Sequence, residues 1–196
     1  METADAAAAD AAAAAAAERA LDAAERLFYR RGIQSVGMDQ IRTESGLSLK
    51  RLYQLFPAKE RLVEAYLERR DERWRRDIAE HVERHEDPER RILAIFDWLG
   101  EWFAAPDFNG CAWINAYGEL GATSDPVARQ VRLHKTAFKE YVTVLAARAD
   151  LPESLGEQVF LLAEGAMATA AITGTPAPAA QASQAAHLLI AATRRP

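Results

Sequence analysis

The chain has 196 residues, of which 49% are hydrophobic and 27% are charged. This composition supplies a buried core and excludes a chain that is disordered throughout, and the length excludes a large multidomain enzyme. The single cysteine, Cys111, excludes an intramolecular disulfide and a cysteine-based zinc cluster, and it favours a reducing, cytoplasmic setting.

Charge is distributed unevenly along the chain, whose formal net charge is -5. Residues 18–76 contain 14 Lys or Arg and 10 Asp or Glu, whereas residues 77–196 contain 10 basic and 16 acidic residues. A basic segment followed by an acidic one indicates a polyanionic partner for the first segment alone.

Two apolar segments raise the question of targeting or membrane insertion. Residues 1–17 include 12 alanines and three acidic residues but no Lys or Arg. A secretory signal begins with basic residues, so we expect a low-complexity N-terminal tail that either extends the first helix or stays frayed. Residues 165–193 lack charged side chains but are rich in alanine and contain two prolines. We therefore expect a pair of helices there and no membrane partner.

From Glu18 onward, apolar residues recur at three- and four-residue spacings, which predicts helices. The first helix ends near Gly32, the second spans Met38 to Ser45, and the third follows Ser48 as N-cap and ends before Pro57. A longer helix begins near Lys59. Pro, Gly and Asp residues then delimit helices over 88–104, 110–120, 126–149, 153–173 and 179–193. No segment alternates like a strand, so the expected fold class is all-α.

Residues 37–56 join two short helices through a tight turn around Gly46. This is the arrangement of a helix-turn-helix, whose second helix enters the DNA major groove. Lys50 and Arg51 would lie in the first turn of that helix, where the helix dipole disfavours each cation by a few tenths to about 1 kcal/mol. A nearby polyanion would reverse this effect. The alternative is that both are solvated charges on a small helical bundle.

The same region carries a longer pattern: Gly32, then Met38-x-x-Ile41, then Ser45-Gly46-Leu47-Ser48-x-x-x-Leu52-Tyr53-x-x-Phe56-x-x-Lys59-Glu60-x-Leu62. Over about 45 residues it resembles the N-terminal DNA-binding domain of TetR-type transcriptional regulators. The resemblance implies a three-helix DNA-binding domain, here residues 18–64, and a larger helical domain, residues 65–196, that dimerises and binds a small ligand. Ligand binding would shift the two recognition helices away from the spacing that DNA requires.

Family roles can be transferred to individual positions of this chain. Residues 48–51 are expected to face the groove, and Tyr53 and Lys59 to grip the DNA backbone. With the polar residues on the exposed helix faces, the expected DNA contacts are Arg42, Thr43, Ser48, Leu49, Lys50, Arg51, Tyr53, Gln54 and Lys59. Gly37 stands where the family commonly has Ser or Thr, so the phosphate contact at that position is either missing or made by the backbone amide.

Residues 88–149 are rich in aromatic side chains, and three of the four tryptophans lie between residues 98 and 113. Aromatic side chains with a few polar groups line small-molecule pockets, whereas ordinary core packing is the alternative for any single ring. Taken with the resemblance, the set favours a cavity for an apolar or aromatic effector. Its expected lining is Trp98, Trp102, Phe103, Cys111, Asn115, Glu119, His134, Phe138 and Tyr141.

Other chemistries have weaker support. His81 and His85 have a spacing that can hold a metal, but charged neighbours favour a solvated face, so no metal or cofactor is expected. Glu119 with His134 is the only acid–base pair that could be nominated, and we expect no catalytic residue. Cys111 would be a redox sensor only if His134 or a helix N-terminus stabilised its thiolate.

The last two predicted helices are apolar on both faces and rich in alanine, which allows close backbone approach. Two such helices from each subunit would form a four-helix interface with two-fold symmetry. The expected interface residues are Phe160, Leu161, Glu164, Met167, Ala168, Ala171, Ala182, Ala186 and Leu189.

The sequence therefore predicts a ligand-responsive transcriptional regulator, expected to be a repressor, that binds a pseudo-palindromic double-stranded DNA operator as a homodimer. A small effector would release it from the operator. The alternative is an α-helical small-molecule-binding protein or enzyme without sequence-specific DNA binding.

Overall fold

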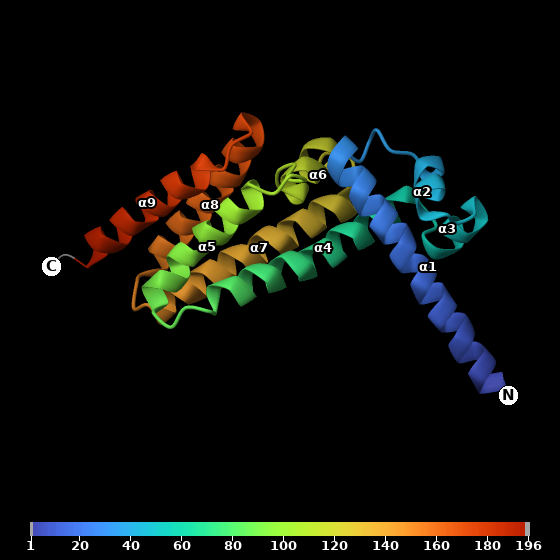
Figure 1. The fold of residues 1–196 in the computed structure, drawn as a ribbon, viewed down its shortest axis with the longest axis horizontal. Coiled ribbons are helices and arrows are strands. Elements are labelled where there is room, and N and C mark those ends of the chain that lie inside the picture. The colour runs from blue at the N-terminus through green and yellow to red at the C-terminus, as the bar shows by residue number, and fades with distance from the viewer. Residues whose placement is uncertain (1, 195–196) are drawn as a thin grey trace. The chain divides into compact units, whose positions relative to one another are not determined.

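The computed structural model describes residues 2–194, and within this range it contains nine α-helices and no β-strand (Figure 1). The helices are α1 (Glu2–Arg31), α2 (Met38–Ser45), α3 (Leu49–Leu55), α4 (Lys59–Val82), α5 (Pro88–Phe103), α6 (Ala112–Leu120), α7 (Asp125–Arg148), α8 (Glu153–Thr173) and α9 (Ala177–Thr193). The all-α fold class is confirmed. From α2 onward, the predicted helix ends agree with the observed ends to within two residues.

Helix α1 is a single helix of 30 residues that includes residues 2–17 (Figure 1). Alanine has the highest helix propensity, so the alanine-rich start extends the helix, which was one of the two alternatives. Ala16, Ala20, Ala24 and Leu27 are buried on one side of α1. The helix ends at Arg31 and is followed by Gly32, whose φ of 83° lies in the left-handed region that favours glycine.

Helices α2 and α3 form the predicted helix-turn-helix. Gly46 follows α2 with φ of 67°, and its N–H donates to the Arg42 carbonyl, which closes the helix. Ser48 then caps α3: its Oγ accepts from the Arg51 N–H at 3.1 Å. Buried side chains of α2 and α3 pack these helices onto α1, which leaves their polar faces outward.

The chain folds into two compact units. The first contains the residues up to Arg69 together with Asn115–Gln130, and the second contains Arg70–Ile114 and the residues from Val131 onward. From the sequence, we expected one uninterrupted boundary between residues 64 and 65. Assignment of residues 115–130 to the first unit has no signature in local periodicity, because it depends on packing between distant parts of the chain.

The second unit contains the helices that were expected to bind a ligand and to dimerise. Within it, α5, α8 and α9 pack against one another, and the Trp74 ring of α4 meets the Phe138 ring of α7 at a centroid distance of 4.9 Å. Among the described residues one helix, α8, is long and apolar enough to cross a membrane by length and composition alone. Core helices share that character, and α8 packs on α5 and α9.

Candidate nucleic-acid interface and effector site

The polar residues predicted to contact DNA lie mostly on the surface of α2 and α3. Leu52 is fully buried and anchors the seven-residue α3 in the first unit. The exposed members of the predicted set are Arg42, Thr43, Ser48, Lys50, Tyr53 and Gln54, while Leu49 and Arg51 are half-buried. The two short helices therefore present a surface that is rich in hydrogen-bonding groups and cations.

The first turn of α3 holds two cations that the protein does not neutralise. It contains no acidic residue, and neither Lys50 nor Arg51 has an ion-pair partner among the described side chains. The positive end of the helix dipole disfavours cations here by up to about 1 kcal/mol each. A bound phosphate backbone would turn this repulsion into attraction, so the arrangement is suited to a polyanion.

On α2, local hydrogen bonds occupy several polar groups. The Gly37 N–H donates to Gln40 Oε1 at 2.8 Å, so this amide already has a partner within the protein. Thr43 Oγ1 donates to the Asp39 carbonyl at 3.0 Å. Arg42 lies 3.4 Å from Asp39 in an exposed pair, which contributes at most about 1 kcal/mol. Arg42 can therefore exchange Asp39 for a phosphate at little cost.

Lys59 differs from Lys50 because it points into the first unit. Its Nζ donates to the Ile33 carbonyl at 2.6 Å and lies 5.9 Å from the centre of the Phe28 ring. Burial lowers the pKa of Lys59, and the charge of Glu119 partly offsets this effect. The ammonium group thus holds the turn after α1.

Glu119 also belongs to the first unit and lies outside the aromatic set with which it was predicted. Its carboxylate accepts from the Ile33 N–H at 2.9 Å and from the Gln34 N–H at 2.7 Å. The Gln34 side chain in turn donates to the Glu119 carbonyl. These bonds fasten the end of α6 to the turn between α1 and α2. The carboxylate partner of His134 is instead Asp71.

The aromatic side chains of the second unit gather around Trp74 of α4. Its ring contacts Trp98 and Trp102 of α5 at centroid distances of 5.3 and 6.2 Å, and Trp113 of α6 at 6.2 Å. It also contacts His134 at 5.1 Å and Phe138 at 4.9 Å. We call these six side chains the aromatic cluster. Phe103 is buried nearby and reaches the cluster through a ring contact with Trp102 at 5.9 Å.

His134 is buried in the cluster and has one charged partner. Its Nδ1 lies 2.6 Å from Asp71 Oδ1 of α4, and its ring stacks on Trp113 with a centroid distance of 3.4 Å and an interplanar angle of 5°. Burial lowers the pKa of His134 to about 4; Lys135 and Arg75 act in the same direction, and Asp71 opposes them. The imidazole is therefore neutral at physiological pH.

Three nitrogen atoms of the aromatic cluster are buried without a hydrogen-bond partner in the protein: Trp74 Nε1, Trp113 Nε1 and His134 Nε2. The Tyr141 hydroxyl, farther along α7, is in the same situation, and burial raises the pKa of Tyr141 to about 12. An unsatisfied buried polar atom costs about 1–3 kcal/mol. The cluster therefore has polar groups that a bound molecule can satisfy.

Cys111 and Asn115 complete the predicted ligand set. Cys111 is buried, and its Sγ lies 3.3 Å from Lys135 Nζ, which also bonds Glu164 at 2.8 Å. Asn115 is exposed and belongs to the first unit. Among the described side chains, no group of three or more His, Cys, Asp or Glu could hold a metal ion.

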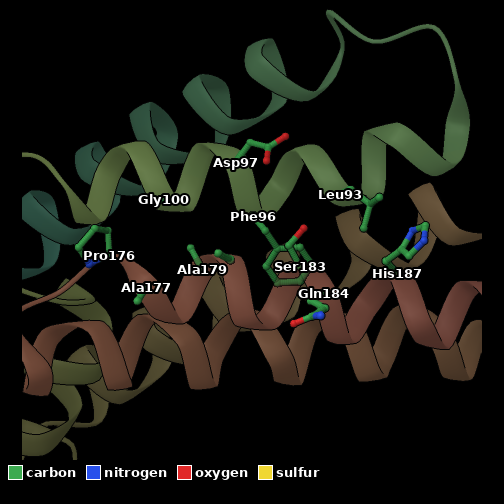
Figure 2. A pocket seen from close by; sticks show the side chains of 11 residues that line it. Leu93, Phe96, Asp97, Gly100, Pro176, Ala177, Ala179, Ser183, Gln184 and His187 are labelled. Atoms are coloured by element: carbon green, nitrogen blue, oxygen red, sulfur yellow. The ribbon is translucent and has the colours of Figure 1, made fainter.

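A surface groove of about 720 Å³ lies between α5 and α9 (Figure 2). Phe96, Asp97 and Gly100 line it from α5, and Ser183, Gln184 and His187 line it from α9. None of the nine residues predicted to bind a ligand lines this groove. The groove and the aromatic cluster are therefore two separate places on the second unit where a small molecule could bind.

The last two helices retain an exposed apolar surface. Leu161 and Ile172 of α8 are 66% and 85% exposed, and Leu188 of α9 is 63% exposed. Three of the predicted interface residues, Met167, Ala182 and Ala186, instead lie inside the unit. Phe160 contacts Phe138 at 5.7 Å, and Glu164 binds Lys135, so both are engaged with α7. Of the other members, Ala168 and Leu189 are half-buried and Ala171 is exposed.

Known transcriptional regulators share features of this chain's sequence and fold. Residues 20–66 match the family model described as bacterial regulatory proteins, tetR family. The structure resembles a TetR-family transcriptional regulator from Streptomyces coelicolor with a TM-score of 0.85 and 28% identity, covering 92% of this chain and 96% of that one. The chain therefore resembles TetR-family regulators in its DNA-binding region and in its fold. A second TetR-type regulator, from Streptomyces avermitilis, matches with a TM-score of 0.73 and 28% identity over 88% of this chain and 98% of that chain.

Sequence similarity to curated relatives is confined to part of the chain. HTH-type transcriptional regulators from two strains of Mycobacterium tuberculosis are 41% identical over 77 residues, which is 39% of this chain and 38% of theirs. The family model includes every residue predicted to contact DNA. The proteins matched are transcriptional regulators, which favours the regulator over the enzyme among the functions weighed from the sequence.

Two members of the aromatic cluster, and the carboxylate that pairs with His134, were not predicted from the sequence to belong to a ligand site. Trp74 was not placed in the ligand set, although it lies at the centre of the aromatic cluster. Trp113 was noted among the aromatic residues without being placed in that set. Asp71 had no role, and its pairing with His134 spans 63 positions of sequence. The only local signal was that all four tryptophans are rare, large residues within a single stretch of 40 positions.

Proposed function

We propose that this chain is a ligand-responsive, cytoplasmic repressor of the TetR family that binds a pseudo-palindromic operator as a homodimer. The observation that carries the proposal is the pair of cations without protein partners, Lys50 and Arg51, in the first turn of α3. They lie in the region that matches the family's DNA-binding domain. Cations at the positive end of a helix dipole are useful where a phosphate backbone approaches.

A dimer would present two copies of α3 to DNA. Helix-turn-helix dimers read half-sites whose centres are about 34–36 Å apart, one helical turn of DNA, or a multiple of that spacing. The exposed apolar residues Leu161, Ile172 and Leu188 support a self-association surface on α8 and α9. We therefore expect an operator with inverted symmetry.

The aromatic cluster is our proposed effector site, because it combines apolar rings with polar atoms that lack partners. Helix α6 has only nine residues. Trp113 near its start stacks on His134, and Glu119 near its end holds the turn that precedes α2. An effector that displaces Trp113 can thereby shift this turn, provided that it binds the displaced state more tightly than the DNA-bound state.

Selection of bound duplexes from a random DNA library tests the DNA-binding part of the proposal. The full chain should be used at near-physiological salt, because non-specific phosphate contacts dominate at low salt. We expect enrichment of an inverted repeat. Binding without any enriched sequence, abolished by added salt, would exclude a sequence-reading regulator.

The direction of regulation has its own test. Deleting the gene should raise transcription of the genes next to the enriched operator, because a repressor blocks them when it is bound. A fall in their transcription would show that the protein activates these genes.

A further inference from the structure

The aromatic cluster holds three buried nitrogen atoms without a protein partner, and their rings touch one another. Trp74, Trp113 and His134 are only 6%, 1% and 1% exposed. Their atoms without a hydrogen-bond partner are the two indole Nε1 atoms and the imidazole Nε2. The ring centroids of Trp74 and His134 are 5.1 Å apart, and those of Trp113 and His134 are 3.4 Å apart. Buried polar atoms are almost always hydrogen-bonded. Three unpartnered nitrogen atoms on contacting rings therefore indicate a binding site for a polar group of another molecule.

The three atoms have different hydrogen-bonding capacities. An indole N–H can only donate, so Trp74 and Trp113 each require an acceptor. Nδ1 of His134 faces the Asp71 carboxylate at 2.6 Å, and an ionised carboxylate can only accept. Nδ1 therefore carries the imidazole hydrogen, and Nε2 is left with a lone pair that requires a donor. The cluster offers two donors and one acceptor.

We infer that the effector is a neutral hydroxyaromatic molecule of the phenol class, whose hydroxyl donates to His134 Nε2 and accepts from the indole N–H of Trp74 or Trp113. The inference rests on the proposed function, because it names the class of molecule that acts at the proposed effector site. A hydroxyl is the smallest group that donates and accepts at one atom. The flat ring of a phenol would pack against Trp98, Trp102 and Phe138, which surround Trp74.

Related classes of molecule match the cluster less well. An aromatic hydrocarbon would leave all three nitrogen atoms without partners. A carboxylate would satisfy the indoles, but it would bring a negative charge toward the His134 lone pair and the nearby Asp71 carboxylate. An ammonium group could donate to His134 but could not accept from an indole. An aryl ether accepts from an indole but leaves His134 Nε2 without a donor.

The chain's own tryptophans provide the measurement. All four tryptophans of the sequence belong to the aromatic cluster, so intrinsic fluorescence reports on this site alone. The full chain should be titrated with para-propylphenol, para-propylanisole, propylbenzene and para-propylbenzoate. We expect the phenol to bind at least about tenfold more tightly than each of the other three, since only the phenol satisfies both a donor and the acceptor.

Single-residue variants test whether the preference for the phenol depends on the unpartnered nitrogen atoms. Trp113→Phe and Trp74→Phe each remove one indole N–H but keep a ring. At least one of them should reduce the preference for the phenol over propylbenzene several-fold. Trp98→Phe is the matched control, because the indole nitrogen of Trp98 is not among the buried atoms without a hydrogen-bond partner. It should change the affinity for all four probes by a similar factor and leave the preference intact.

Three results would overturn the inference. The first is equal affinity for the phenol and the hydrocarbon, which would mean that water satisfies the nitrogen atoms. The second is a preference for the benzoate, and the third is an unchanged preference in both Trp113→Phe and Trp74→Phe. These results leave the DNA selection experiment untouched, so the two proposals fail separately. A protein that selects an inverted repeat but ignores phenols would still be a regulator, and one that binds phenols but selects no sequence would not.

Discussion

Lys50 and His134 both obtain their importance from what surrounds them. Lys50 is exposed at the start of a helix that has no acidic residue in its first turn, so its charge is available to an incoming polyanion. His134 is buried beside Asp71 and among aromatic rings, so its charge is suppressed. In another environment, either side chain would be an ordinary surface or core residue.

Lys50→Ala should weaken binding to the selected operator by about tenfold, because one base or phosphate contact of a cation contributes about 1–3 kcal/mol. The measurement is a gel-shift titration on the operator and on variants with single base-pair changes. Lys139→Ala is the matched control, since Lys139 is exposed in the second unit and pairs with Glu157. A uniform loss on all sequences would assign Lys50 to the phosphates, and no loss at all would contradict its place in the interface.

The free energy of unfolding should fall as the pH is lowered from 6.5 to about 4, because of His134. Its folded-state pKa of about 4 lies below its ordinary value of 6.5, so within this window the unfolded chain binds the proton that the folded chain excludes. The total loss is at most roughly 3 kcal/mol. Burial alone would raise the pKa of Asp71, but the hydrogen bond from His134 and the charge of Arg75 lower it. Asp71 thus stays ionised through the window.

Urea denaturation at a series of pH values checks this expectation. The comparison variant is His134→Gln, which keeps a polar side chain but cannot take up the proton. The difference in stability between the two proteins should change across the window and become constant below about pH 4. Parallel pH profiles for the two proteins would contradict the assignment of a suppressed charge to His134.

At the scale of elements, the turn between α1 and α2 is held by side chains from helices that are distant in sequence. Glu119 of α6 accepts from two consecutive backbone N–H groups of the turn, and Lys59 of α4 donates to the Ile33 carbonyl of the same turn. Opposite charges thus satisfy the donors and the acceptor of one short segment. Because this segment leads directly into α2, its position bears on the helix-turn-helix.

Glu119→Ala should lower the free energy of unfolding by roughly 2–3 kcal/mol, because two backbone donors lose a charged acceptor. Amide hydrogen exchange at Ile33 and Gln34 should accelerate in the same variant. Glu68→Ala is a suitable control, since Glu68 is exposed on α4 in the same unit. Unchanged exchange at both amides would show that the carboxylate does not hold this turn in solution.

At the scale of the whole molecule, α8 and α9 leave an apolar surface that no other part of the described chain covers. Leu161, Ile172 and Leu188 are each more than half exposed. Alanine and glycine between them allow helix backbones to approach closely, which suits a symmetric contact between copies of the chain. Helix α8 is apolar enough to resemble a membrane span. A helix that is buried on both sides requires the same composition.

The double variant Leu161→Glu with Leu188→Glu should convert a dimer to a monomer, because it places charges in the apolar contact. Sedimentation velocity over a range of concentrations measures the change. Binding to the inverted repeat should also fall at least about tenfold, since the two half-sites would no longer be bound by one linked pair. Leu133→Glu, at an α7 residue that is 57% exposed, is the control. A double variant that remains dimeric would place the interface elsewhere.

The sequence alone determined the features that depend on neighbouring residues. Apolar spacing, capping residues and helix-ending glycines or prolines act over a few positions, so the helices, the helix-turn-helix turn and the exposure of Lys50 and Gln54 followed from local patterns. The alanine-rich start left two alternatives open, because propensity alone does not decide whether a long helix frays.

Only the tertiary structure decided which distant residues meet. Glu119 and Ile33 are 86 positions apart, and His134 and Asp71 are 63 apart. No periodicity links such pairs, because their contact depends on how whole helices pack. Packing also buries Met167 inside the unit and leaves Leu161 exposed, although both residues lie on the same apolar helix, α8. An apolar residue is equally suited to a core or to an interface, and only the positions of the surrounding helices determine which of the two it joins.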